Sequence, residues 1–101
     1  MSPAMEIAAD RRRKVLDALS QMRDGLLGED LILRVVSGMG RDTDRTILRA
    51  DFEFLQQHGC VRIEKVEKPG SEFWLVKLTD DGLLAAQGHL RVSGVAFRTV
   101  G

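Results

Sequence analysis

The most regular apolar and polar pattern in the chain runs from Asp44 to Val61. Leu48, Phe52 and Leu55 recur at spacings of four and seven residues, which places them on one face of a helix. The opposite face carries Thr46, Arg49, Ala50, Glu53 and Gln57. The pattern therefore predicts an amphipathic helix with one face in the core and one polar face free to meet a partner.

Both ends of this helix carry boundary signals. Asp44 or Thr43 can cap its start by accepting a hydrogen bond from an unpaired backbone N–H. Gly59 can adopt the left-handed conformation that ends a helix, and Cys60 then falls where a hydrophobic contact back to Leu55 is expected. We therefore predict that the helix ends in a tight turn.

Two further helices are predicted before it. The first begins with a cap and a proline, Ser2 and Pro3, and has a natural stop at Gly25. Its apolar stripe consists of Ala8, Val15, Leu16, Leu19 and Met22. The second begins at residues 28–30, with acids at the positive end of its dipole, and stops within residues 37–40. Its apolar face consists of Leu31, Ile32, Val35, Val36 and Met39.

A period of two residues replaces the helical period after Gly59. Residues 61–64 alternate between apolar and charged side chains, as in a half-buried strand. Residues 68–71, Lys-Pro-Gly-Ser, are a strong turn signal ahead of a return strand. The core face of that strand is predicted to hold Trp74, Val76 and Leu78. Phe73 and Leu75, on the other face, are expected to be partly exposed, or covered by the tail or by another subunit.

The end of the chain is predicted to contain one more short helix and a tail. Residues 79–82 cap and acidify the start of the helix, which ends near Gly88. Residues 89–101 are interrupted by Gly94, so we expect an extended segment that packs on its own domain or on a second subunit. This reading divides the chain into one domain, residues 1–88, and a C-terminal tail, residues 89–101.

Charge limits the kinds of partner. The chain has 101 residues, enough for one domain with a single core, and carries 15 basic and 15 acidic residues. A neutral chain must concentrate its Lys and Arg locally to bind nucleic acid. The densest basic run, Arg11 to Lys14, is interpreted mostly as solvated helix surface, with a phosphate clamp as the alternative.

Several classes of protein are disfavoured. The single cysteine, Cys60, excludes an internal disulfide framework and a cysteine-rich zinc site, and it is best read as a small buried hydrophobe. No apolar run approaches the roughly eighteen residues of a membrane span, so we expect a cytoplasmic protein that does not bind membranes. His58 and His89 lie near no recognisable nucleophile. We therefore expect neither an enzyme nor a cofactor.

Two motifs carry a family resemblance. Residues Ala50, Asp51, Leu55 and Gly59 form the pattern ADxxxLxxxG, preceded by basic residues, and residues 78–82 have the form LTxxG. With the predicted hairpin, this resembles small ArsR-like winged helix-turn-helix regulators, especially the short ArsR-like proteins of Mu-like phages and prophages. The resemblance implies an α+β fold with a three-helix core, a two-stranded β-hairpin wing and a short C-terminal helix. It also implies transcription regulation by binding double-stranded DNA, with a homodimer as an open alternative to a monomer.

The third predicted helix would then enter the major groove. Arg45, Thr46 and Arg49 on its polar face are expected nearest the bases. Asp51 lies at the edge of the buried face and is expected to pair within the protein, for example with Arg34.

Residues outside that helix would position the DNA backbone. Arg41 in the preceding turn, with Lys65 and Lys68 in the hairpin, is expected to contact phosphates. The alternative is a winged helix that binds protein without sequence-specific DNA binding. Its contact surface would contain Phe73, Leu75 and Phe97.

Overall fold

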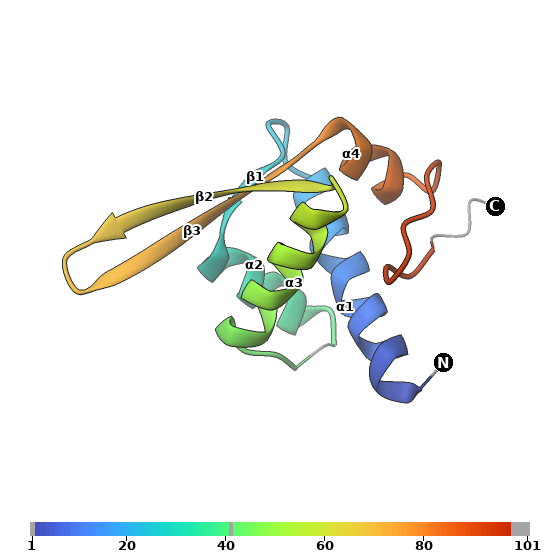
Figure 1. Ribbon diagram of the computed structural model, residues 1–101, viewed down its shortest axis with the longest axis horizontal. Coiled ribbons are helices and arrows are strands. Elements are labelled where there is room, and N and C mark those ends of the chain that lie inside the picture. Colours follow the sequence, from blue (N-terminus) through green and yellow to red (C-terminus); the bar gives the residue numbers. More distant parts are fainter. Residues whose placement is uncertain (1, 41, 98–101) are drawn as a thin grey trace.

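The computed structural model describes residues 2–40 and 42–97, which form four helices and a three-stranded antiparallel sheet. The elements are α1 (Pro3–Ser20), β1 (Leu26–Gly28), α2 (Glu29–Gly38), α3 (Arg45–Gln57), β2 (Val61–Lys68), β3 (Ser71–Leu78) and α4 (Asp80–Ala86). The hairpin of β2 and β3 extends well beyond the helices, whereas α1, α2 and α3 pack together at its base (Figure 1).

Helix α1 begins as predicted but ends early. The Ser2 hydroxyl accepts a hydrogen bond from the Met5 N–H at 3.2 Å, and Pro3 occupies the first turn. Val15, Leu16 and Leu19 are fully buried in the core. Met22 was predicted to extend this stripe, and that prediction is wrong, because the helix has ended at Ser20 and the Met22 side chain is exposed.

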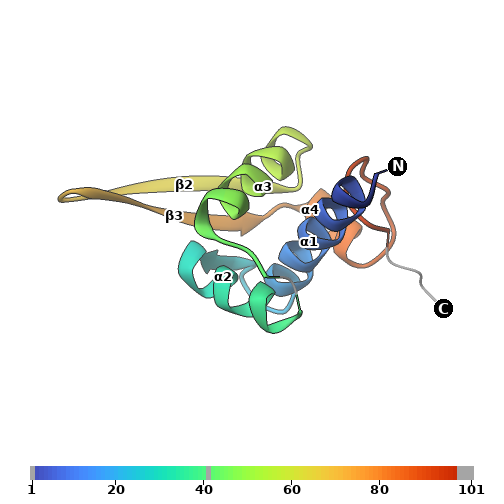
Figure 2. The same cartoon turned by 90° about the horizontal axis from the view of Figure 1, so that it is seen from below.

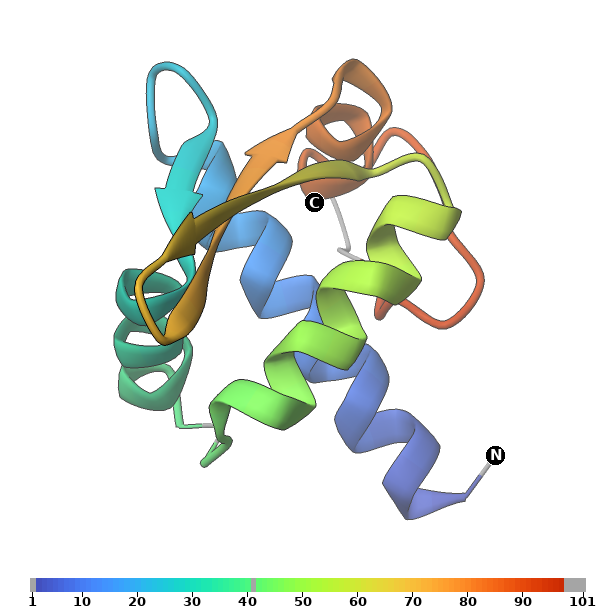
Figure 3. The ribbon, with the colours of Figure 1, turned by 60° about the vertical axis from the view of Figure 1, so that its left-hand side comes forward.

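Helix α3 confirms the strongest sequence pattern. Asp44 caps it by accepting a hydrogen bond from the Ile47 N–H at 2.9 Å. At the other end the Cys60 N–H donates to the Leu55 carbonyl, and Gly59 has a φ of +75°. This is the Schellman arrangement that a glycine after the last turn favours. Leu48, Phe52 and Leu55 are buried in the core. Helix α3 crosses α1 (Figure 3).

The sheet has one strand more than the sequence pattern indicates. Strands β2 and β3 pair from Val61 opposite Leu78 to Lys68 opposite Ser71, with Gly70 at positive φ in the turn. Strand β1 pairs with the other edge of β3 over residues 26–28. Three residues are too few to show a period of two, which explains why the sequence did not predict β1.

The faces of the central strand β3 are those predicted. Trp74 and Val76 are buried in the core, and Phe73 and Leu75 on the other face are half-buried. Phe73 lies against the backbone of Gly28, where an added Cβ would approach its ring to 2.6 Å. The neighbouring strand β1 therefore accounts for part of the cover on this face.

The chain after β3 returns to the helices. Helix α4 packs on α1, and the tail follows it at the end of the molecule opposite the hairpin tip (Figure 2). The Ala96 N–H donates to the Ala9 carbonyl of α1 at 3.0 Å, so the tail through Phe97 packs on its own domain. The predicted tail residues 98–101 lie outside the described residues.

Candidate nucleic-acid interface

The predicted contact residues lie on α3 and the adjoining hairpin. Arg45 and Thr46 are exposed in the first turn of α3, and Lys65 and Lys68 are exposed on β2. Arg49 lies one turn after Arg45, but its side chain is only 26% exposed. Arg41 lies outside the described residues.

Arg49 is held by a buried carboxylate. Its Nε lies 2.7 Å from Glu29 Oε1 and its Nη2 lies 2.8 Å from Glu29 Oε2. Arg49 Nη2 also donates to the Glu72 carbonyl, and the Trp74 N–H donates to Glu29 Oε2 at 2.7 Å. Glu29 is 1% exposed at the start of α2. One carboxylate therefore joins α2, α3 and β3. The prediction that Arg49 lies nearest the bases must be corrected, because its guanidinium is bound within the protein.

The surroundings of Glu29 and Arg49 favour the charged form of each side chain. Burial by itself would raise the pKa of Glu29, but hydrogen bonds from Arg49 and the Trp74 N–H, with the charges of Arg49 and Arg45, lower it overall. The hydrogen bond to Glu29 is the largest cause that raises the pKa of Arg49, and it outweighs the opposing effect of burial. Glu29 and Arg49 therefore form an ion pair that holds the elements together and does not exchange a proton. We call this pair the Glu29 brace.

Arg45 is held much more loosely. It forms an ion pair with Asp30, and its Nε lies 3.8 Å from Glu29 Oε1. The side chains of Arg45 and Asp30 are 51% and 55% exposed. Exposed pairs of this kind contribute only about 0–1 kcal/mol, so a phosphate could take the place of Asp30 at little cost.

Trp74 forms the junction between α3 and the hairpin. The guanidinium carbon of Arg49 and the Nζ of Lys65 each lie 4.6 Å from its ring centroid. Lys68 instead lies 4.7 Å from the ring centroid of Phe73, whose side chain is on the other face of β3. The structure thus brings Lys65 next to Arg49 and places Lys68 on the opposite face of the hairpin.

Acidic side chains are interleaved with these cations. On and before α3 they are Asp42, Asp44 and Glu53, and on the hairpin they are Glu64, Glu67 and Glu72, all exposed. Among the described residues, Lys65 and Lys68 have no ion pair. The positive charge is therefore local, at Arg45 and the hairpin lysines, and not a continuous strip.

The basic run of α1 has an internal role that the sequence reading missed. Arg11 and Arg12 both pair with Asp51, which is buried on α3, so the suggested partner Arg34 is wrong. Arg13 is buried and donates to the carbonyls at the end of α4. The interpretation of this run as mostly solvated surface is wrong for these arginines. The position of Asp51 at the buried edge of α3 was the available signal for this role of the arginines. A buried carboxylate requires a cation from elsewhere in the fold.

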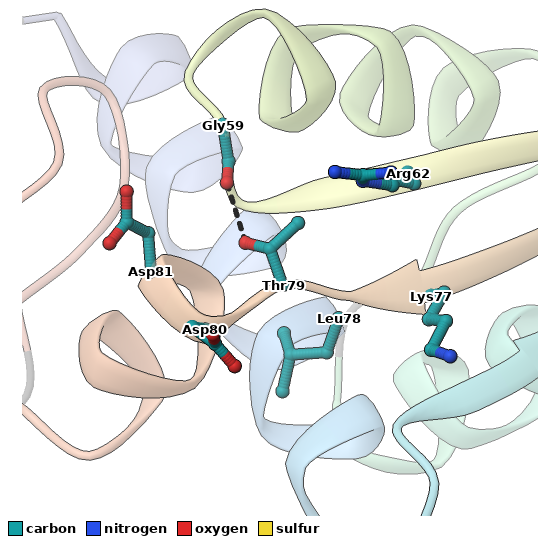
Figure 4. A pocket seen from close by; sticks show the side chains of 7 residues that line it. All are labelled: Gly59, Arg62, Lys77, Leu78, Thr79, Asp80 and Asp81. Carbon is teal, nitrogen blue, oxygen red and sulfur yellow. Dashed lines mark hydrogen bonds between the residues drawn. The ribbon is translucent and has the colours of Figure 1, made fainter.

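A shallow hollow of about 580 Å³ lies at the base of the hairpin. Arg62 and Lys77 face it from opposing strands, and Asp80 and Asp81 face it from α4 (Figure 4). The Thr79 hydroxyl donates to the Gly59 carbonyl at 2.5 Å beside it. Its two bases and two acids balance, so this hollow offers no strong attraction for an anion.

Across residues 2–40 and 42–97, no three His, Cys, Asp or Glu side chains gather in a way that could hold a metal ion. Burial, with a smaller effect of the Asp81 charge, raises the pKa of the Cys60 thiol. None of the described helices has both the length and the apolar character needed to cross a membrane.

Comparison of the chain with protein-family models, with curated proteins and with solved structures found no match.

Proposed function

We propose that this protein is a winged-helix DNA-binding protein that regulates transcription, of the type of the small ArsR-like regulators. The element order and the β1-β3-β2 sheet are compatible with a winged helix, in which β2 and β3 form the wing. The proposal is carried by one observation. The start of α3 is exposed beside an extended hairpin, with Lys65 and Arg49 on the ring of Trp74 and Arg45 exposed one turn before Arg49.

In this proposal the two ends of the site have different tasks. Recognition helices contact base edges mainly through their N-terminal residues, and Arg45 and Thr46 are the first two residues of α3. Arg45 would exchange Asp30 for a phosphate or a guanine edge. Lys65 would neutralise a phosphate next to the helix, while Arg49 holds α3 at a fixed position against the hairpin.

The same geometry predicts that the free energy of DNA binding depends on a small number of phosphate contacts. Only Arg45, Lys65 and Lys68, with Arg41 outside the described residues, are candidates for phosphate contacts. The nearby acids oppose any additional attraction. We therefore expect modest non-specific affinity and a specificity that depends strongly on contacts at the start of α3.

A second candidate function is a winged helix that binds protein. It is favoured by apolar side chains on the exposed surfaces of α2 and α3. Ile47 on α3 and Leu31 on α2 are about equally exposed, at 40% and 41%. Phe97 is exposed as well, whereas Phe73 and Leu75 are half-buried and offer less area than the sequence suggested. Apolar side chains of this kind can serve as anchors in a protein interface.

Fluorescence anisotropy with a labelled mixed-sequence duplex at low salt tests the DNA proposal. Arg45→Glu and Lys65→Glu should each weaken binding by about tenfold or more, since contacts of this kind contribute about 1–3 kcal/mol. Arg62→Glu is the matched control, because Arg62 is exposed on the opposite face of β2 from Lys65. Absence of binding by the unaltered protein, or an equal loss with all three variants, would reject the proposed interface and favour the protein-binding candidate.

A further inference from the structure

A groove of about 820 Å³ lies between the N-terminal half of α1, the end of α3 and the tail. Its apolar lining includes Met5, Ala8, Phe54, Val95 and Phe97. Pockets that bind small organic molecules typically have volumes of about 300–1,000 Å³ and are lined mainly by apolar groups. The groove therefore has the size and surface of a small-molecule site.

Specific contacts hold the walls of this groove. The rings of Phe54 and His58 stack with their centroids 4.2 Å apart. Gly94 of the tail lies so close to Phe54 that an added Cβ would come within 2.4 Å of the ring. The Ala96 N–H bonds to the Ala9 carbonyl, which fixes the tail along α1. These contacts form the walls of the groove without a ligand.

The charged groups of the groove favour an anion. Arg12 lies 3.8 Å from the ring centroid of Phe54, and Arg91 lies 3.9 Å from that of Phe97. A guanidinium stacked on a ring keeps N–H donors at its edges available for a carboxylate. Glu6 is the sole carboxylate among the described lining residues. Two guanidinium groups against one carboxylate disfavour an organic cation.

The arginines differ in the donors that they have left. Arg12 donates its Nε to Asp51 and its Nη1 to the Gly94 carbonyl, at 3.1 Å each. Arg91 is exposed and has no hydrogen bond or ion pair with another described residue. Arg91 is thus the main group able to bind an incoming anion, and Arg12 supports it while holding the groove together.

We propose that this groove binds a small amphipathic monocarboxylate. The apolar body of the ligand would lie on Ala8, Phe54 and Val95, and its carboxylate would pair with Arg91 near the rim. Because Phe54 lies on α3, a ligand in the groove would contact the proposed recognition helix directly, and Arg12 would link it to Asp51 of the same helix. The binding site itself does not depend on whether the protein binds DNA.

The test is an NMR titration of the full chain with octanoate, with octanol as the uncharged probe of equal chain length. Octanoate should cause saturable shifts of the backbone amide signals of Ala8, Phe54 and Val95. Octanol should bind about tenfold more weakly, because it lacks the charge-assisted hydrogen bonds. Arg91→Gln should weaken octanoate binding to a similar degree and leave octanol binding unchanged. Arg62→Gln, a change of the same type at the hairpin base, should have no effect.

Three results would overturn the proposal. Equal affinity for octanol and octanoate would show non-specific apolar binding only. Shifts that are absent, or that centre away from the groove, would show that it takes no such ligand. Groove shifts that appear on raising the protein concentration without a probe would show that a second copy of the chain covers it.

Discussion

Arg49 of α3 binds Glu29 of α2 through two parallel contacts, Nε to Oε1 at 2.7 Å and Nη2 to Oε2 at 2.8 Å. The same carboxylate accepts the backbone N–H of Trp74, so the pair also fixes β3. The polar face of α3, which was predicted to contact DNA, thus partly serves to hold α3 to its own domain. Arg45 remains as the exposed arginine in the first turn of α3.

Arg49→Ala should therefore lower stability. Removing the guanidinium leaves a buried carboxylate without its partner, and breaking a buried pair in this way typically costs about 3–5 kcal/mol. Urea denaturation monitored by Trp74 fluorescence measures the free energy of unfolding. Arg45→Ala is the matched control and should change it by less than about 1 kcal/mol, because that pair is exposed. Equal, small losses for both variants would show that the brace is unimportant.

The Glu29 brace should also give stability a specific pH dependence. The pKa of Glu29 in the folded protein lies below its ordinary value of 4.5, so its stabilising effect is complete above that pH. The effect is lost as the pH falls through the lower folded value. The difference in unfolding free energy between the unaltered protein and Glu29→Gln should accordingly shrink below pH 4.5. A difference that stays constant across acidic pH would contradict this assignment.

The sequence predicted α3 well but did not predict the ion pair that Arg49 forms with Glu29, for a physical reason. Helical periodicity and caps are local signals, and they located Asp44 at the start and Gly59 after the end. An ion pair between Glu29 and Arg49 depends on how two helices and a strand cross, which no local pattern encodes. A polar residue on an outward face can therefore still be bound by a neighbouring element.

Asp51 should be a second stabilising centre. It is buried and paired with Arg11 and Arg12 of α1, so Asp51→Asn would leave two guanidinium groups without their shared counter-charge. We expect a loss of at least about 2 kcal/mol in the free energy of unfolding. Arg34→Ala is the control, since Arg34 is exposed and does not pair with Asp51. Comparable losses in the two variants would contradict the observed pairing.

The LTxxG motif should require its glycine for steric reasons. A Cβ at Gly82 would lie 2.0 Å from the Cys60 carbonyl oxygen, and the Thr79 hydroxyl accepts from the Gly82 N–H in the same turn. Gly82→Ala should therefore lower the free energy of unfolding by at least about 1–3 kcal/mol. Gly38→Ala should be neutral or stabilising, because a Cβ there meets nothing within 4 Å. An unaffected melting temperature for Gly82→Ala would contradict the close approach.

The motifs behind the family resemblance thus have structural roles. Asp51 and Gly59 hold α3 in place, and Thr79 and Gly82 attach the start of α4 to the end of α3. Local geometry of this kind restricts the residue types at these positions, which is why such positions stand out in a sequence. The proposed DNA contacts depend instead on exposed side chains such as Arg45, for which the sequence has no local signature.

The most direct measurement of the central claim is the salt dependence of binding to duplex DNA. If Arg45 and Lys65 contact phosphates, alone or with Lys68 and Arg41, the logarithm of the binding constant should fall with the logarithm of salt concentration. The slope should lie between about −2 and −4, at roughly −0.9 per phosphate neutralised. Lys65→Gln should reduce its magnitude by about 1. Binding that is absent at low salt, or that does not weaken as salt rises, would contradict the DNA-binding account.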